Sequence, residues 1–271
     1  MLIAQISDTH ISEDDGFMER TYETAACLRR AVDHLIQLPV KPDLVMVTGD
    51  CVDTGTDWEY ARFRELLQPL TMPVHVIPGN HDDRTRMRTV FGAQGAQAMD
   101  GFVQYVVDID PLRLIALDTN IPGAPGGKLC AQRLDWLEAR LAEVPDRPTV
   151  IFMHHPPFAT GMKVMDGMGL ADADAFGAVV ARHPQIERVL AGHIHCTLQR
   201  RFHGTIAASC PSTATQIQLD LAHPERLSVS REGAACLLHS WSEETGLLTS
   251  VSEISGPRPV DILFDGEKWT V

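Results

Sequence analysis

The sequence lacks several features that would assign it to other classes of protein. It has no apolar run long enough for a membrane-spanning helix and no basic segment followed by a small-residue cleavage site at its start. Lys and Arg number 23 against 36 Asp and Glu, and the net charge of −13 disfavours a nucleic-acid groove or an anionic membrane as partner. The six cysteines form no CxxC pair, which is typical of reduced thiols. We therefore expect a cytoplasmic protein of 271 residues with no nucleic-acid polymer and no membrane as partner.

Metal-binding types of side chain follow five short apolar runs, at 2–6, 44–47, 74–77, 150–153 and 189–191. The side chains after these runs are Asp8 and His10, Asp50, Asn80 with His81 and Asp82, His154 with His155, and His193 with His195. A strand that ends at such a residue places it on the rim of a sheet, where open α/β folds bind ligands. The spacings D-x-H and H-x-H put both members of a pair on one face of an extended chain. Carboxylate, imidazole and amide groups suit zinc, manganese or iron, so the pattern predicts a polynuclear metal site.

The five groups carry a resemblance to a known family. The strings ISDTHI, VTGDCVDTG, IPGNHDDR, FMHHPPF and AGHIHC occur in this order between residues 6 and 196. This order resembles the calcineurin-like binuclear metallophosphoesterases, in particular the bacterial branch of glycerophosphodiesterases and class III cyclic-nucleotide phosphodiesterases. The resemblance implies a four-layer α/β/β/α sandwich with two mixed sheets, completed by a C-terminal strand hairpin.

The resemblance also implies a ligand set. The first metal would be held by Asp8, His10 and His195, and the second by Asn80, His154 and His193. Asp50 would bridge them, because a carboxylate offers two anionic oxygens to metals about 3.5–4 Å apart. The expected catalytic residues are His81 and Asp50, and the expected substrate contacts are Asn80, His81 and His195. Iron, manganese, zinc or cobalt would fit these ligands.

The expected reaction is hydrolysis of a small phosphodiester by in-line attack of a metal-bound hydroxide, with His81 stabilising the transition state or protonating the leaving alkoxide. Two divalent ions, two carboxylates and one hydroxide leave a single positive charge, which a diester balances and a monoester dianion exceeds. Glycerophosphodiesters and 3′,5′-cyclic nucleotides are the two leading substrates. The alternative is a phosphomonoesterase, nucleotidase or pyrophosphohydrolase on the same metals. A non-catalytic scaffold is disfavoured because every expected ligand and His81 are present.

Structural roles are the alternative for each residue taken alone. A single His10 or His154 is more often a core or surface histidine, and Asp8 could be a turn residue. These alternatives do not explain why every strand end carries a ligand type. Next to the expected ligands, His155 should point to the opposite face and make a structural hydrogen bond. Asp82 is expected to orient His81 or a ligand histidine, and Asp83 to begin a helix.

The remaining sequence predicts alternating helices and strands. Helices are expected over 21–38, 59–67, 84–91, 131–141 and 172–181, and further strands over 113–117, 205–208, 215–221, 234–239 and 247–254. We predict a catalytic core over 1–210, with 211–271 completing the domain and a tail that contacts a neighbour in a homo-oligomer. Two features stay open at this point: the role of Thr215, and whether Met162, Met165 and Met168 form a lid or fill a core gap.

Overall fold

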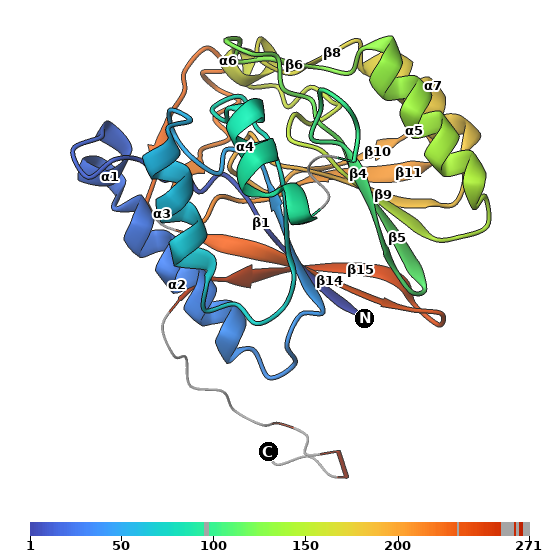
Figure 1. Cartoon of the computed structure of the whole chain (residues 1–271), viewed down its shortest axis with the longest axis horizontal. Coiled ribbons are helices and arrows are strands. Elements are labelled where there is room, and N and C mark those ends of the chain that lie inside the picture. Colours follow the sequence, from blue (N-terminus) through green and yellow to red (C-terminus); the bar gives the residue numbers. More distant parts are fainter. Residues whose placement is uncertain (95–97, 232, 256–262, 264–265, 268–271) are drawn as a thin grey trace.

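Two mixed β-sheets pack face to face between two layers of helices (Figure 1). The computed structural model of the chain describes residues 1–94, 98–231, 233–255, 263 and 266–267. The helices are α1 (Phe17–Tyr22), α2 (Thr24–Gln37), α3 (Asp57–Leu67), α4 (Arg84–Val90), η1 (Gly92–Gln94), α5 (Ala131–Glu143), α6 (Lys163–Asp166) and α7 (Ala173–Arg182). This arrangement confirms the expected α/β/β/α sandwich.

The first sheet has the strand order β15-β14-β1-β2-β3. Its members are β1 (Leu2–Ile6), β2 (Leu44–Thr48), β3 (Val74–Ile77), β14 (Ala235–Ser242) and β15 (Gly246–Glu253). β1, β2 and β3 are parallel, while β14 runs antiparallel to both β1 and β15. The C-terminal hairpin expected from the sequence is therefore confirmed, and it lies at one edge of this sheet.

The second sheet has the order β10-β11-β9-β7-β5-β4. Its members are β4 (Tyr105–Ile109), β5 (Leu112–Ala116), β7 (Thr149–Phe152), β9 (Ile186–Ala191), β10 (Gln199–Phe202) and β11 (Thr205–Ser209). The four central strands are parallel, and both edge strands are antiparallel to their neighbours. Two small ribbons pair β6 (Gly127–Lys128) with β8 (Leu170–Ala171) and β12 (Gln216–Ile217) with β13 (Val229–Ser230).

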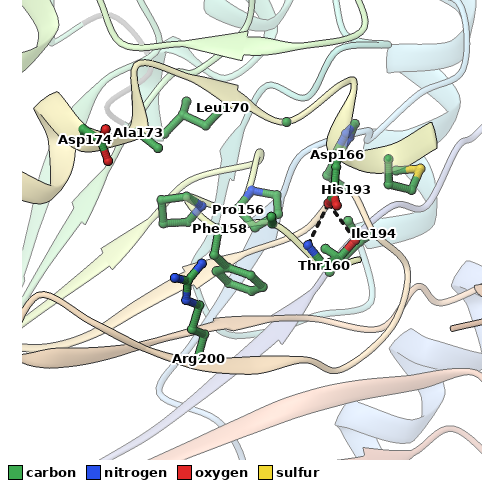
Figure 2. A pocket seen from close by; sticks show the side chains of 14 residues that line it. Pro156, Phe158, Thr160, Asp166, Leu170, Ala173, Asp174, His193, Ile194 and Arg200 are labelled. Atoms are coloured by element: carbon green, nitrogen blue, oxygen red, sulfur yellow. Dashed lines mark hydrogen bonds between the residues drawn. The ribbon is translucent and has the colours of Figure 1, made fainter. Parts of the chain in front are cut away.

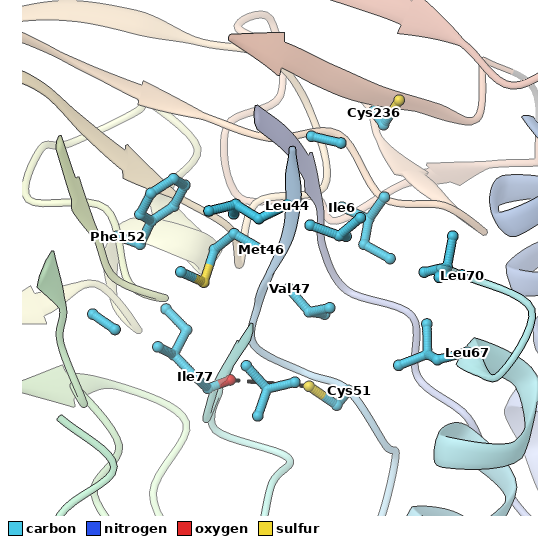
Figure 3. Close-up of a cluster of buried hydrophobic side chains, with 14 of the residues drawn as sticks. Ile6, Leu44, Met46, Val47, Cys51, Leu67, Leu70, Ile77, Phe152 and Cys236 are labelled. Carbon is cyan, nitrogen blue, oxygen red and sulfur yellow. Dashed lines mark hydrogen bonds between the residues drawn. The ribbon is translucent and has the colours of Figure 1, made fainter. Parts of the chain in front are cut away.

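The core explains why the central strands are apolar on both faces. Along β7, Val150 and Phe152 belong to the cluster between the two sheets, whereas Ile151 belongs to the cluster under α5 and α7. Phe152 shares the inter-sheet cluster with Leu44 and Met46 of β2 (Figure 3). Successive side chains of a strand point to opposite faces, so a strand covered on both sides must be apolar throughout. This double burial fixes the strand ends from which the polar residues emerge.

Two expected elements differ in the structure. The helix expected over 21–38 is broken at Glu23, whose left-handed φ of 53° ends α1 before α2 begins. The break is stabilised by the Glu19 carboxylate, which accepts hydrogen bonds from Thr24 Oγ1 at 3.0 Å and Ala25 N at 2.9 Å. The strand expected over 215–221 is reduced to β12, because Asp220 accepts from two backbone amides that follow it and closes a turn. β4 was not predicted.

The C-terminal region is part of the first sheet. β14 pairs with β1 in register Leu2 to Ser240, so the chain after residue 210 supplies strands to the first sheet. The division into 1–210 and 211–271 stays a prediction. Most of the tail from residue 256, with its expected contact to a neighbour, lies outside the described residues. Within the described ranges, no helix combines the length and apolarity needed to cross a bilayer.

Acid sensitivity of the fold should follow from one buried histidine. His239 lies in β14 between Thr249 Oγ1 at 2.9 Å and Gln5 Oε1 at 3.2 Å, and burial together with Arg188 lowers its pKa to about 3. Above the unfolded-state value of about 6.5 neither state is protonated here, whereas below it only the unfolded state gains a proton. We expect this residue to cost about 1.4 kcal/mol of unfolding free energy per pH unit below about 6.5.

The measurement is urea unfolding at pH 7.5 and 5.5 for the wild type and His239→Gln. Because the other titrating groups are shared, the difference between the two proteins isolates this histidine. An equal loss of stability in both proteins would contradict the prediction.

Candidate metal centre

The strand ends of both sheets bring the predicted ligands into one buried cluster. Asp8 follows β1, Asp50 follows β2 and Asn80 follows β3, while His154 follows β7 and the last two histidines follow β9. Among the described residues, four groups of three have possible ligand atoms within 4.8 Å of one another. Two contain predicted ligands alone, Asp8 with His10 and His195, and Asp8 with Asp50 and His154; the other two are His154 with His155 and His193, and His10 with Asp53 and His81. Asn80 Oδ1 lies 3.2 Å from His154 Nε2, so the expected set converges on one place.

The first group directs two imidazole nitrogens toward each other. His195 donates its Nδ1 proton to the carbonyl oxygen of Thr215 at 3.0 Å, so its neutral ring presents a lone pair on Nε2. That lone pair faces Nε2 of His10 at 3.2 Å and Oδ1 of Asp8 at 3.4 Å. Electron-rich atoms at these distances require a cation or a shared proton between them, and a metal ion fits this donor set.

The second group repeats the arrangement. His154 donates from Nδ1 to the carbonyl oxygen of Thr48 at 2.8 Å, which leaves the lone pair of Nε2 facing Asn80 Oδ1 and, at 3.3 Å, Asp50 Oδ2. Nε2 of His193 is buried without a hydrogen-bond partner among the described residues, and its ring lies 5.1 Å from that of His154. A buried nitrogen without a partner is costly, so its position also fits a metal ligand.

Asp50 is the acidic residue between the two groups. Its Oδ2 lies 3.3 Å from His154 and 3.7 Å from His10, and its Oδ1 accepts the backbone N–H of His81 at 2.9 Å. Burial alone raises the pKa of this carboxyl, but His154 and His10 lower it well below its ordinary value. Against the effect of burial, Asp50 raises the pKa of His154 to about 9, so the space between Nε2 of His154 and this carboxylate favours a positive charge, either a proton or a metal ion. Asp50 therefore remains an anion that both groups of ligands can share.

Backbone strain is concentrated at the same residues. φ is 54° at Asp8, 43° at His10, 46° at Asp50, 72° at His193 and 46° at His195. Only three other non-glycine residues of the described chain have a positive φ. Each such conformation costs about 1–3 kcal/mol and persists only where the surroundings enforce it, which is common at functional sites. The left-handed turns redirect the chain at the strand ends and aim the side chains into the cluster.

Two glycines are needed for this approach. A Cβ at Gly79 would lie 2.1 Å from Oδ1 of Asp50, and a Cβ at Gly49, where φ is 90°, would lie 2.4 Å from Nδ1 of His154. Both distances are far below contact distance. Glycine at these positions lets the turns after β2 and β3 pass directly against the ligand side chains.

His155, Asp83 and Asp82 lie next to the predicted ligands in the sequence, and each has defined hydrogen-bond partners. His155 donates from Nε2 to the carbonyl oxygen of Pro125 at 3.2 Å, and its Nδ1 lies 2.8 Å from Thr119 Oγ1, so the expected structural hydrogen bond is present. Asp83 begins α4 as expected and accepts from Arg86 N at 2.8 Å. The expectation for Asp82 was wrong. Its carboxylate accepts the backbone N–H groups of the turns after β2 and β3 and the hydroxyl of a tyrosine, and so it orients loops rather than a histidine.

Asp53 is a site residue that sequence reasoning missed. Its carbonyl oxygen accepts from Nδ1 of His81 at 2.8 Å, and its carboxylate lies 3.5 Å from the same nitrogen and 3.6 Å from Nδ1 of His10. Burial lowers the pKa of His81, but Asp53 and Asp50 raise it to about 10. The only signal in the sequence is its position three residues after Asp50 in VTGDCVDTG.

A second missed feature is the support under the loop 79–82. Asn120 donates from Nδ2 to the carbonyl oxygens of Gly79 and Asp82, and Asp118 binds the guanidinium of Arg84. Arg84 is therefore occupied in a buried ion pair. The other two arginines of α4 bind acidic or carbonyl groups on the surface or in the following loop, so none of the three lines the cavity over the site.

A cavity of about 290 Å³ opens over the ligand cluster. His10, Asp50, Asn80, His81, His193 and His195 line its polar end. A neighbouring cavity of about 290 Å³ shares His193 and Met165 with it, and Figure 2 shows Phe158 and Arg200 on one side of that neighbour. In the segment 160–168, which lines this neighbouring cavity, Asp166 accepts hydrogen bonds from both the backbone N–H and the hydroxyl of Thr160 (Figure 2).

The three methionines of this segment pack in a small core cluster or line the cavity, and a lid role stays a prediction. Met162 is buried with Ile194 and Ile217 in a small apolar cluster. Met165 belongs to the same cluster and also lines the cavity over the ligands, as does Met168. The segment therefore fills a core gap and forms part of the cavity wall at the same time.

Thr215 has a defined contact in the structure. Its carbonyl oxygen and its Oγ1 both lie 3.0 Å from Nδ1 of His195. Loss of an outer-shell partner typically costs about 10–100-fold in metal affinity or activity. Because the backbone carbonyl remains in Thr215→Val, we expect kcat/KM to fall by less than about tenfold. Steady-state kinetics with metal analysis would check this, and a loss of a hundredfold in a folded variant would assign the orientation of His195 to the hydroxyl.

The fold and the cluster define a class of protein, and comparison of the sequence with known families gives the same class. The family model described as calcineurin-like phosphoesterase matches residues 1–197. The chain belongs to the calcineurin-like phosphoesterase family.

The relatives within this family are diesterases by name. The chain is 33% identical over 263 residues to a probable glycerophosphodiester phosphodiesterase, GpdQ, of Arcobacter nitrofigilis, covering 96% of each chain. It is 32% identical over 216 residues to the 3′,5′-cyclic adenosine monophosphate phosphodiesterase CpdA of Pseudomonas aeruginosa, covering 80% of this chain and 77% of the relative. A dimetal phosphatase from Danio rerio shares the fold with a TM-score of 0.67 at 17% identity, covering 94% of this chain and 99% of the other.

Proposed function

We propose that the protein is a binuclear metal-dependent phosphodiesterase that hydrolyses small phosphodiesters. The proposal rests on one observation. Imidazole nitrogens and carboxylate oxygens come together in two neighbouring groups, and Asp50 lies between the two groups. The names of the two relatives, one acting on glycerophosphodiesters and one on cyclic AMP, support diesters as the substrate class.

The chain's own residues would hold two ions of iron, manganese, zinc or cobalt. Asp8, His10 and His195 would hold the first, Asn80, His154 and His193 the second, and Asp50 would contact both. When bound, such ions lower the pKa of water toward about 7 and neutralise phosphate charge. Thr48 and Thr215 fix the tautomers of two ligand histidines through their carbonyl oxygens, so the nitrogens that face the metals are set before binding.

The remaining residues at the polar end would act on the substrate. Asn80, His81 and His195 line the cavity and would contact the phosphate. His81 donates from Nδ1 to Asp53, so Nε2 is the nitrogen left to carry a proton to the leaving oxygen. The backbone N–H of His81 binds Asp50, which ties the proton donor to the shared ligand.

The charge around the cavity favours a diester over a monoester. None of the described residues that line it is a lysine or an arginine, and Arg84 is paired with Asp118. A monoester dianion would lack the additional cations that its second charge needs. A phosphomonoesterase, nucleotidase or pyrophosphohydrolase on the same metals is the alternative that the experiment must distinguish.

The test is the ratio of kcat/KM for bis(p-nitrophenyl) phosphate to that for p-nitrophenyl phosphate, measured on manganese-reconstituted protein. We expect a ratio well above one, with activity lost after treatment with a chelator and restored by manganese. A ratio below one would replace the proposal with the monoesterase alternative. The cytoplasmic location and the homo-oligomeric state stay predictions, which cell fractionation and light scattering would test.

A further inference from the structure

The cavity over the candidate metal centre has an apolar wall with a pair of aromatic rings, of which Phe17 is exposed and Tyr22 half-buried. Phe17 and Tyr22, at the two ends of α1, line the cavity together with Leu227 and Val229. The rings of Phe17 and Tyr22 lie 5.9 Å apart at an interplanar angle of 83°. Phe17 is 62% exposed, Leu227 48% and Val229 44%. These four residues are called the α1–β13 wall below.

Contact between the two segments makes this a single wall. The guanidinium of Arg231, two residues after Val229, lies over the ring of Tyr22 at 5.4 Å from its centroid. The segment that carries β13 therefore lies against α1, although the two are more than 200 residues apart in the sequence. Arg231 covers Tyr22 without itself lining the cavity, so it supports the wall and adds no charge to the lining.

The chemistry of the wall differs from that of the polar end. Apart from Thr215, Asp53, the hydroxyl of Tyr22 and the groups assigned to metal and phosphate, the side chains of the described lining residues offer only carbon and thioether surface, which includes Met165 and Met168. A polar group enclosed there without a partner would lose its hydrogen bonds to water. The face of a flat aromatic group gives up no hydrogen bonds to water when it is buried there, and it makes favourable contacts with aromatic edges and thioethers.

We infer that the α1–β13 wall selects phosphodiesters that carry a flat aromatic group, such as a nucleobase, over diesters of glycerol with polar head groups. The inference rests on the proposed function, because the phosphate must lie at the polar end for the rest of the substrate to reach the wall. Phe17 and Tyr22 are the specificity-determining residues, and they act through contact with the substrate outside the reacting atoms.

The experiment measures kcat/KM for 3′,5′-cyclic AMP and for glycerophosphoethanolamine on manganese-loaded wild type and Phe17→Ala. Base–aromatic contacts are commonly worth about tenfold or more in binding. We expect the wild type to prefer cyclic AMP and the ratio of the two kcat/KM values to fall about tenfold in Phe17→Ala, mainly through KM for the nucleotide. Trp58→Ala is the matched control, since Trp58 is an aromatic residue 42% exposed on α3 and outside the cavity, and it should leave the ratio unchanged.

Each outcome separates the inference from the proposed function. A wild type that hydrolyses both diesters but whose ratio is unaffected by Phe17→Ala would overturn the inference and leave the diesterase standing. Absence of activity on any diester would instead overturn the proposed function. A change of molecular mass in light scattering for Phe17→Ala would also overturn the inference, by showing that the wall is covered by a second copy of the chain. Leu227→Ser, at an exposed position of the same wall, should also lower the ratio of kcat/KM for cyclic AMP to that for glycerophosphoethanolamine. Agreement between the two variants would show that the effect belongs to the wall and not to one substitution.

Discussion

Asp50→Asn is expected to lower kcat/KM for any phosphodiester by about a thousandfold or more, equivalent to about 4 kcal/mol of transition-state stabilisation. The substitution preserves the size of the side chain but removes its negative charge. In the structure this carboxylate lies between the two ligand groups, 3.3 Å from His154 and 3.7 Å from His10. Loss of an outer-shell partner alone costs about 10–100-fold, so loss of an anion shared by both ligand groups should cost more.

Metal content separates this prediction from a general loss of structure. Elemental analysis after dialysis should give close to two ions for the wild type and a reduced number for Asp50→Asn, with circular dichroism unchanged. Asp108→Asn is the matched control. Asp108 lies on β4, forms ion pairs with Arg113 and Arg147, and takes no part in the ligand cluster. Full occupancy with nearly normal activity in Asp50→Asn would show that the two ligand groups do not share this residue.

The ligand cluster could be predicted because its signals are local. Each ligand type follows an apolar run, and parallel strands bring their carboxyl ends to one edge of a sheet. Asp8 and His193 follow strands of different sheets, and they meet because the two sheets pack face to face, with the backbone N–H of His193 3.1 Å from the Asp8 carboxylate. The left-handed backbone at these residues was not predictable, because only the packed surroundings enforce it.

The features that were missed depend on contacts between distant loops. The role of Asp53 requires the turn after β2 to meet His81 from the turn after β3, and the α1–β13 wall requires Arg231 to reach Tyr22. Neither contact has a periodicity or a spacing that marks it in the sequence. The break at Glu23 was missed for a related reason: the expected helix from residue 21 included the end of α1, and the Glu19 carboxylate at the break acts through side-chain hydrogen bonds.

His81 differs from the ligands in its surroundings. Its side chain is 39% exposed, whereas those of Asp8 and His154 are fully buried, and it lines the cavity. Its Nδ1 is occupied by the carbonyl oxygen of Asp53 at 2.8 Å. A histidine fixed at one nitrogen and open at the other is suited to donate a proton from Nε2, and the proposed ligand set does not include it.

His81→Ala should therefore reduce hydrolysis of alkyl diesters far more than hydrolysis of nitrophenyl diesters. An alkoxide leaves only when it is protonated, whereas a nitrophenolate leaves as a stable anion, so a general acid worth about 10²–10⁴-fold matters only for the first. We expect a fall of about a thousandfold in kcat/KM for glycerophosphoethanolamine and of less than about tenfold for bis(p-nitrophenyl) phosphate. The two substrates control for each other in one protein preparation, and metal content should stay at the wild-type level, in contrast to Asp50→Asn. Equal losses on both substrates would remove the acid role and leave His81 as a residue that only stabilises charge on the phosphate.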